Sequence, residues 1–121
     1  MAQRLQAQIN RGGLPMWLAI TIGIWAWTIH MFFLASTAEL ACQHHSFEWV
    51  MHAATAGLIA VTLAGVAVCL KMVRSTQDSE DAPTVGGRNH FLGLLGLISN
   101  SFNIGLILLE GIYVPFLHAC R

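Results

Sequence analysis

The chain alternates between long apolar stretches and short polar ones. The apolar stretches cover about residues 14–41, 47–73 and 91–117. Each is long enough for a helix that crosses a bilayer, which takes about 20 apolar residues. A short turn separates the first two stretches, and a polar loop at 75–90 separates the second from the third. The pattern predicts an all-α membrane protein, with residues 1–121 forming one domain of three transmembrane helices.

The third stretch carries polar groups that recur at helical spacing. Gly93, Gly96, Asn100, Asn103 and Glu110 follow one another by three, four or seven residues, so they share one face of a helix. A carboxyl and two amides are costly against hydrocarbon, so this face should meet protein. The two glycines permit close helix packing. Asn100 and Asn103 are therefore predicted to make interhelix or subunit contacts.

A depth count gives Glu110 a partner in the first stretch. His30 lies 12 residues before Cys42, and Glu110 lies 10 residues before Cys120. At about 1.5 Å per residue these depths agree to within a turn. We therefore predict a buried hydrogen-bonded pair, either structural or contributing to a proton or quinone site. Haem is not expected within this chain alone, because His52 lies several residues nearer the outer surface than His30.

The two cysteines used in this count lie just beyond the same ends of their helices. If that face is the oxidising side of a bacterial inner membrane, Cys42 and Cys120 are predicted to form a disulfide. The other interpretation is two free thiols at one depth. Cys69 lies within the second stretch and is predicted to be a small buried hydrophobic residue.

Histidines and carboxylates also gather at this outer surface. The candidate metal ligands are His44, His45, Glu48 and His52, with His118 and Glu39 nearby. His44, Glu48 and His52 have the spacing i, i+4, i+8 of one helix face, and imidazole with carboxylate can hold Zn or Cu. In the alternative interpretation they are interfacial residues that bond one another and lipid headgroups. No strict metal-binding motif is present.

Composition and charge agree with a membrane protein. Hydrophobic residues make up 55% of the chain and charged residues 10%, against about 25% in soluble domains. The net charge is zero, so nucleic acid is not an expected partner. Five basic residues fall on one side of the predicted spans: Arg4, Arg11, Lys71, Arg74 and Arg88. Since only Arg121 falls on the other side, the N-terminus is predicted to be cytoplasmic and the C-terminus periplasmic.

Two surfaces are candidates for contact with a larger partner. Small residues recur at helical spacing in the second stretch, at Ala53, Gly57, Ala60, Ala64 and Ala67. Such a ridge lets helix backbones approach closely in a membrane. The first stretch carries an aromatic group that is predicted to face lipid or a partner subunit: Trp25, Trp27, Phe32 and Phe33.

These residues together resemble a known family. The pattern comprises Ala26-Trp27, His30, Cys42 and His52, then a third span of the form RxxFLGLLGLxxNxxxxxxxLLEGIxxxFLxxC from Arg88 to Cys120. It is similar to small three-span bacterial membrane proteins encoded beside haem–copper cytochrome c oxidase subunits. The resemblance implies a bacterial inner membrane and a terminal oxidase or related respiratory assembly.

The function predicted from these features is that of an accessory structural subunit of a larger respiratory membrane complex. The chain is not expected to be catalytic on its own, because it lacks a CxxCH motif and a haem-ligand pair at one depth. Its partners would be larger integral membrane subunits and lipid. The alternatives are an assembly or metal-delivery factor that uses the outer histidines, and a proton or quinone site at His30 and Glu110.

Overall fold

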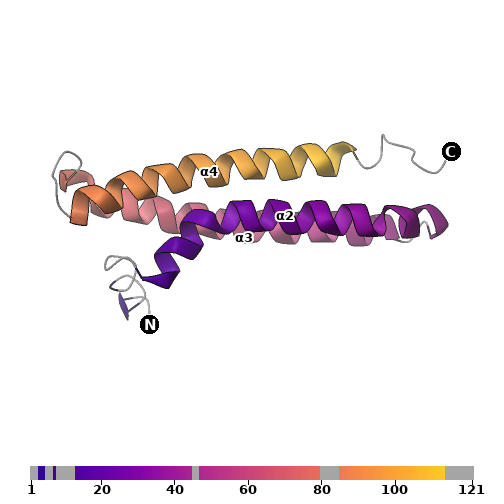
Figure 1. The fold of residues 1–121 in the computed structure, drawn as a ribbon, viewed down its shortest axis with the longest axis horizontal. Coiled ribbons are helices and arrows are strands. Elements are labelled where there is room, and N and C mark those ends of the chain that lie inside the picture. The colour runs from indigo at the N-terminus through magenta and orange to yellow at the C-terminus, as the bar shows by residue number, and fades with distance from the viewer. Residues whose placement is uncertain (1–2, 5–6, 8–12, 45–46, 80–84, 114–121) are drawn as a thin grey trace.

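The described part of the chain forms a bundle of three long helices. The computed structural model describes residues 3–4, 7, 13–44, 47–79 and 85–113. In this part of the chain the long helices are α2 (Leu14–Gln43), α3 (Phe47–Ser75) and α4 (Val85–Tyr113), with a short 3-10 helix η1 (Gln77–Ser79) between the last two. Each long helix packs against both others, and successive helices run in opposite directions (Figure 1). The start of α2, the end of α3 and the start of α4 therefore lie at one end of the bundle.

All three helices are long and apolar enough to cross a membrane. Their apolar spans cover Leu14–Leu40, Phe47–Ser75 and Gly86–Tyr113. In an apolar 18-residue stretch of each span, only 22%, 22% and 28% is buried inside the bundle, so most of this apolar surface is left for lipid or for other proteins. The all-α class and the three span-length helices predicted from the sequence are confirmed.

Local sequence fixes the first helix boundaries. Pro15 lies in the first turn of α2, where its missing N–H is harmless, and Gly13 O accepts hydrogen bonds from the amides of Met16 and Trp17. At the far end, the His44 amide donates to Leu40 O at 3.0 Å. Phe47 then donates its amide to His44 O, so α3 begins almost at once and must run back along α2.

The predicted start of the third span was wrong by about two turns. The polar loop was predicted to cover residues 75–90, which include Gly86 and Gly87, yet α4 begins at Val85. The reason is tertiary packing, which can override the low helix propensity of glycine. Asn89 and His90 are only 2% and 5% exposed, and His90 Nδ1 lies 3.2 Å from Thr76 Oγ1 beyond the end of α3.

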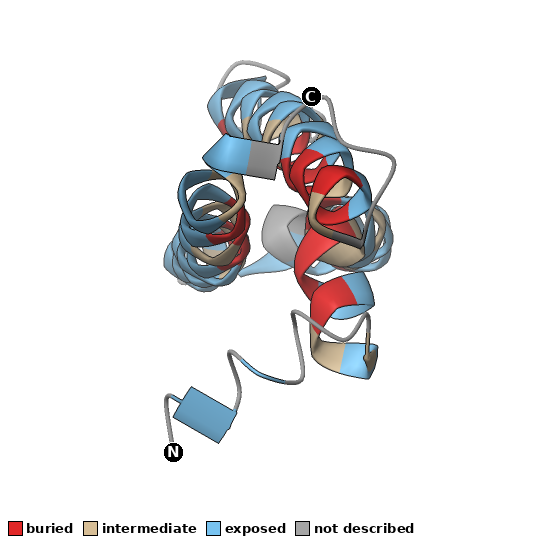
Figure 2. Cartoon of the chain, turned by 90° about the vertical axis from the view of Figure 1, so that its left-hand side faces the viewer, coloured by how far each residue is buried: buried red, intermediate tan, exposed pale blue. Residues whose placement is uncertain are grey.

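The interior is built on close helix approach. Buried residues face the interior where the helices meet (Figure 2). At the end where α4 begins, the core consists of Met16, Ala19, Ile20, Cys69 and Met72. Gly96 lets α4 approach this core, since a Cβ there would lie 2.6 Å from Cys69 Sγ and 3.3 Å from Ile20 Cα. Cys69 is fully buried, as predicted, and Gly93 makes a similar approach to Val73.

This close approach makes Gly96 sensitive to a single added methyl group. We expect Gly96→Ala to lower the free energy of unfolding by about 1–3 kcal/mol, because the methyl group overpacks the contact with Cys69 and Ile20. The matched control is Gly105→Ala on the same helix, where a Cβ would meet no atom within 4 Å. Reversible unfolding in mixed micelles, followed by circular dichroism, measures both variants. Equal stability of the two would contradict the packing described for α4.

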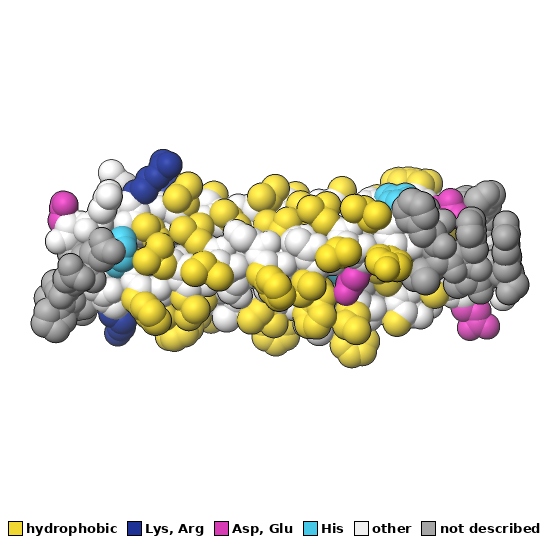
Figure 3. Space-filling view, turned by 90° about the horizontal axis from the view of Figure 1, so that it is seen from above, with side chains coloured by type: hydrophobic (Ala, Val, Ile, Leu, Met, Phe, Trp, Pro, Cys, Tyr) yellow, Lys and Arg dark blue, Asp and Glu magenta, His cyan; other side chains and the backbone are white. Residues whose placement is uncertain are grey.

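The outer surface is apolar along most of its length. Hydrophobic side chains cover the middle of the bundle, and Lys and Arg lie near one end (Figure 3). Trp25 and Phe32 are 59% and 71% exposed, so they have the outward position predicted for the aromatic group of α2. The small-residue ridge of α3 is exposed at all five positions, which are Ala53, Gly57, Ala60, Ala64 and Ala67. The helices of this chain therefore do not use the ridge to pack together.

Candidate functional site

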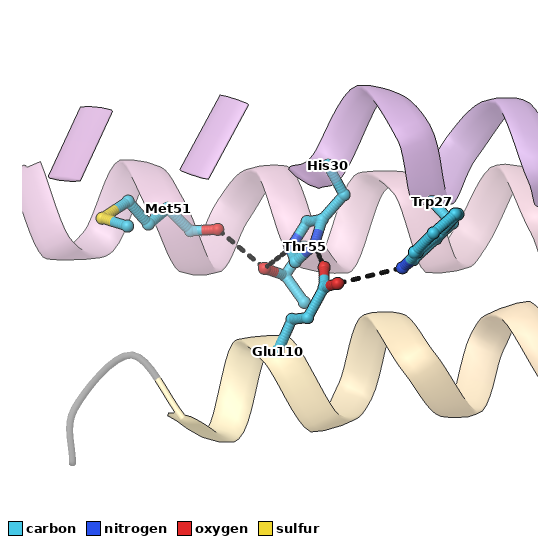
Figure 4. A network of polar contacts seen from close by, with 5 residues as sticks. All are labelled: Trp27, His30, Met51, Thr55 and Glu110. Atoms are coloured by element: carbon cyan, nitrogen blue, oxygen red, sulfur yellow. Dashed lines mark hydrogen bonds and ion pairs between the residues drawn. The ribbon is translucent and has the colours of Figure 1, made fainter. Parts of the chain in front are cut away.

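A polar network joins the three helices in the half of the bundle away from the start of α4 (Figure 4). His30 of α2 lies at its centre and is fully buried. Its Nδ1 lies 2.8 Å from Glu110 Oε2 on α4, and its Nε2 lies 2.8 Å from Thr55 Oγ1 on α3. The contact between His30 and Glu110 is the one that the depth count predicts. Both ring nitrogens thus have a partner on another helix.

The Thr55 hydroxyl fixes the direction of one of these hydrogen bonds. Thr55 Oγ1 lies 2.9 Å from Met51 O, one turn back along α3. A carbonyl can only accept, so the hydroxyl gives its one hydrogen to Met51. It therefore accepts from His30, and Nε2 of the imidazole carries a hydrogen. Neutral His30 in this arrangement has a bare Nδ1 facing Glu110.

The Glu110 carboxyl receives a second donor from α2. Trp27 Nε1 donates to Glu110 Oε1 at 2.9 Å, so each carboxyl oxygen has one hydrogen-bond partner. The sequence pattern placed Trp27 among residues that face lipid or a partner, and this was wrong. Trp27 is half-buried because its indole N–H reaches Glu110. Its position three residues before His30, on the same helix face, is the signal that could have predicted this contact.

Thr55 was also missed by the sequence pattern. It is 9% exposed and lies against Gly111 of α4, whose Cβ, if present, would come within 2.9 Å of the Thr55 methyl group. Threonine within a span commonly bonds the carbonyl four residues back, so its type alone gave no sign of a histidine partner. The small Gly111 beside Glu110 brings α4 close enough to α3 for Thr55 and Glu110 to contact the same imidazole.

A second polar contact lies near the middle of α4, at Asn100. This residue is fully buried. Its Oδ1 accepts from the Gly23 amide at 2.9 Å, and its Nδ2 donates to Ala19 O at 2.8 Å. Gly23 permits the contact, because a Cβ there would lie 2.6 Å from Asn100 Oδ1. The interhelix contact predicted for Asn100 is present, while its burial excludes contact with another subunit.

The two backbone groups that Asn100 bonds belong to residues four positions apart in α2. In a regular helix the amide of Gly23 would donate to the carbonyl of Ala19, four residues earlier. The Asn100 carboxamide supplies a further partner to both groups. A side chain that enters this ladder is a known cause of helix bending. The first turns of α2 do run at an angle to the rest of the helix (Figure 1).

Asn103 stays within its own helix. It is 6% exposed, and its Nδ2 donates to Ser99 O at 2.7 Å. A Cβ on Gly23 would lie 3.1 Å from the Asn103 Cβ, so Asn103 packs against α2. The described contacts include no hydrogen bond from Asn103 to that helix. Thr62 of α3 donates its hydroxyl hydrogen to Leu58 O in its own helix.

The outer histidines do not form a metal site in the described part of the chain. His44, Glu48 and His52 are all exposed. Among the residues that the structure describes, no group of three histidines, cysteines or carboxylates lies close enough to hold a metal ion. His45 and His118 lie outside the described residues, so a site that includes them stays a prediction.

The proposed disulfide also falls outside the described structure. Cys120 lies in the segment 114–121, and the side chain of Cys42 is not described. A bridge between Cys42 and Cys120 therefore stays a prediction. Non-reducing mass spectrometry that finds both thiols open to alkylation would exclude it.

Comparison with known proteins gives no further assignment. The chain matches no protein-family model, no curated protein and no solved structure. The features of the chain that bear on its function are therefore the His30 network, the Asn100 contact and the exposed surfaces of the three helices.

Proposed function

We propose that this protein is an accessory structural subunit that packs within the membrane against a larger integral membrane protein. The observation that carries the proposal is the exposed small-residue ridge of α3, which runs from Ala53 to Ala67. Helices associate in lipid through close van der Waals packing, and small residues permit it. Inside the bundle, other small residues such as Gly65 and Gly96 make the close approaches. The ridge is thus left available for a helix of another chain.

The two polar contacts support a structural role. His30, Thr55 and Glu110 join all three helices, and Asn100 ties α4 to the backbone of α2. Hydrogen bonds of this kind hold helices together where burial of apolar surface gives no driving force. The bundle can then present a fixed outer face to its partner. This proposal gives the chain no catalytic role of its own.

The setting is proposed from the sequence pattern. The third-span pattern from Arg88 to Cys120 resembles proteins encoded beside haem–copper oxidase subunits, which favours a respiratory complex of terminal-oxidase type in a bacterial inner membrane. Lys71, Arg74 and Arg88 all lie at the end of the bundle where α2 begins. By the positive-inside rule this end would be cytoplasmic, and the end nearer His30 and Glu110 would be periplasmic.

Co-purification tests the proposal. Isolated in a mild detergent, the chain should bring with it a larger integral membrane protein whose absorbance shows bound haem. We expect Gly57→Leu to abolish this association, because the leucine holds the ridge away from the partner helix. Gly57 has no atom within 4 Å of its Cβ position, so the variant should fold normally.

The matched control is Gly105→Leu, at an equally open position on α4. It should retain the partner. If Gly57→Leu also retains it, the ridge is not the contact surface. If the co-purified protein carries no haem, the terminal-oxidase assignment is wrong, while the accessory role stands. If no membrane protein accompanies the wild-type chain under any mild condition, the accessory role is wrong.

A further inference from the structure

The Glu110 carboxyl lies at the boundary between the polar network and the apolar outer surface. Its side chain is 28% exposed, whereas His30 behind it is not exposed at all. An acidic side chain interrupts the hydrophobic surface away from both ends of the bundle (Figure 3). The other carboxylates described on the long helices, Glu39 and Glu48, are exposed and lie near the helix ends. Glu110 is thus a carboxyl within a span that can be reached from outside the bundle.

The hydrogen-bond pattern sets how many protons this site holds. Thr55 gives its hydrogen to Met51 O, so His30 Nε2 is a donor in every state of the pair. The opposite nitrogen, Nδ1, lies 2.8 Å from Glu110 Oε2, a distance that requires a hydrogen between the two atoms. If that hydrogen were absent, two lone pairs would face each other at this distance. The contact therefore contains one proton, on Oε2 or on Nδ1.

The electrostatics of the His30–Glu110 pair also favour one proton in the contact. With one proton in the contact, the pair is either carboxylic acid with neutral imidazole or carboxylate with imidazolium, and its net charge is zero. Without that proton, a negative charge would remain beside the apolar surface, and the Trp27 N–H is the donor that the described residues offer it. Charged groups within a membrane span are costly unless they are paired. Tyr113, three residues beyond Glu110 on α4, and Glu48 and His52 of α3 are also titratable, and all three are exposed.

We propose that His30 and Glu110 form a binding site for a single proton, and that this proton exchanges through the exposed edge of the Glu110 carboxyl. Thr55 holds the imidazole in one orientation, so only Nδ1 can share the proton with the carboxyl. Trp27 holds Oε1, which leaves Oε2 as the oxygen in the contact. The site does not depend on a partner protein, and it is therefore separate from the proposed accessory role.

A lipid-soluble carbodiimide provides a direct test. Dicyclohexylcarbodiimide dissolves in the bilayer and reacts with protonated carboxyls. The Glu110 O–H adds across one C=N bond: a bond forms between the carboxyl oxygen and the central carbon, and the proton moves to nitrogen. An acyl shift to nitrogen then gives a stable N-acylurea, with no leaving group and no change in oxidation state.

We expect the purified wild-type chain in lipid vesicles to acquire one adduct, which peptide mass spectrometry places on Glu110. Glu110→Gln should remove it, and Glu39→Gln, which changes an exposed carboxyl near a helix end, should leave it in place. A water-soluble carbodiimide with an amine nucleophile should modify Glu39 at least ten times faster than Glu110.

Three outcomes would overturn the proposal. The first is a wild-type chain that acquires no adduct at Glu110, because a proton in the contact must at times be on the carboxyl. The second is labelling of Glu39 or Glu48 by the lipid-soluble reagent at the same rate as Glu110. The third is equal labelling of Glu110 and Glu39 by the water-soluble reagent, which would place Glu110 in water. Since the adduct is located on the wild-type chain, the test stands even if a variant fails to fold.

Discussion

Replacing Asn100 by leucine is expected to straighten α2 and to loosen its contact with α4. Leucine has the same branched skeleton as asparagine, with bulkier methyl ends, but can neither accept from the Gly23 amide nor donate to Ala19 O. Interhelical hydrogen bonds in membranes contribute about 0.6 kcal/mol on average and about 1.7 kcal/mol at most. The loss of two such bonds should lower the free energy of unfolding by about 1–3 kcal/mol.

Straightening follows from what the freed backbone groups can do. The Gly23 amide and Ala19 carbonyl stand in the i, i−4 relation, so without Asn100 they can bond to each other. This recovers part of the lost stability, and it removes the cause of the bend. Spin labels at Leu14 and Ile29, both exposed and on either side of Gly23, should therefore move apart. Replacing Cys42 and Cys120 by serine leaves only the buried Cys69 as a native thiol.

The control for Asn100 is its neighbour Ser101, which is exposed. Ser101→Leu adds the same side chain to the outer face of α4 and should change neither the stability nor the label distance. If Asn100→Leu lowers the stability but leaves the distance unchanged, the bend has another cause. If it changes neither, the two hydrogen bonds contribute nothing measurable to the bundle.

The position of a residue along the helix axis was predicted well from the sequence, because the rise of a helix per residue is fixed. Counting from Cys42 and Cys120 placed His30 and Glu110 at one level, and they are in contact. Rotation about the helix axis was harder to predict. Trp25 and Trp27 were assigned to one outward aromatic group, yet Trp25 is 59% exposed while Trp27 turns towards Glu110.

Contacts with the backbone could not be predicted from residue types. Asn100 had no evident side-chain partner in the first two spans, because its partners are the amide of Gly23 and the carbonyl of Ala19. Every residue offers such groups, and helices normally satisfy them internally. Gly23 was the available signal, since it is the small residue on α2 that leaves room for the carboxamide. The ridge of α3 is exposed at all five positions, so its predicted contact with a larger partner stays a prediction.

The largest loss of stability is expected for His30→Leu. This change leaves the Glu110 carboxyl and the Thr55 hydroxyl without their shared partner. Removing one partner of a buried ion pair costs about 3–5 kcal/mol in soluble proteins, and the partial exposure of Glu110 favours the lower end of that range. Thr55→Val should cost about 1–3 kcal/mol, because His30 Nε2–H then lacks its acceptor. Unfolding in mixed micelles measures both variants.

Glu110→Gln distinguishes the arrangement of hydrogens in the network, since a glutamine reproduces the protonated carboxyl. Its amide nitrogen can donate to the bare Nδ1 of His30, and its oxygen can still accept from Trp27. We therefore expect a loss of stability below about 1 kcal/mol, with the bundle intact.

If Nδ1 instead carried the hydrogen in every state, the amide oxygen would turn to His30 and the amide nitrogen would face the Trp27 N–H. Two donors would then oppose each other, and Glu110→Gln would destabilise the protein about as strongly as Thr55→Val. Comparable losses in these two variants would show that the hydrogen positions assigned to His30 are wrong.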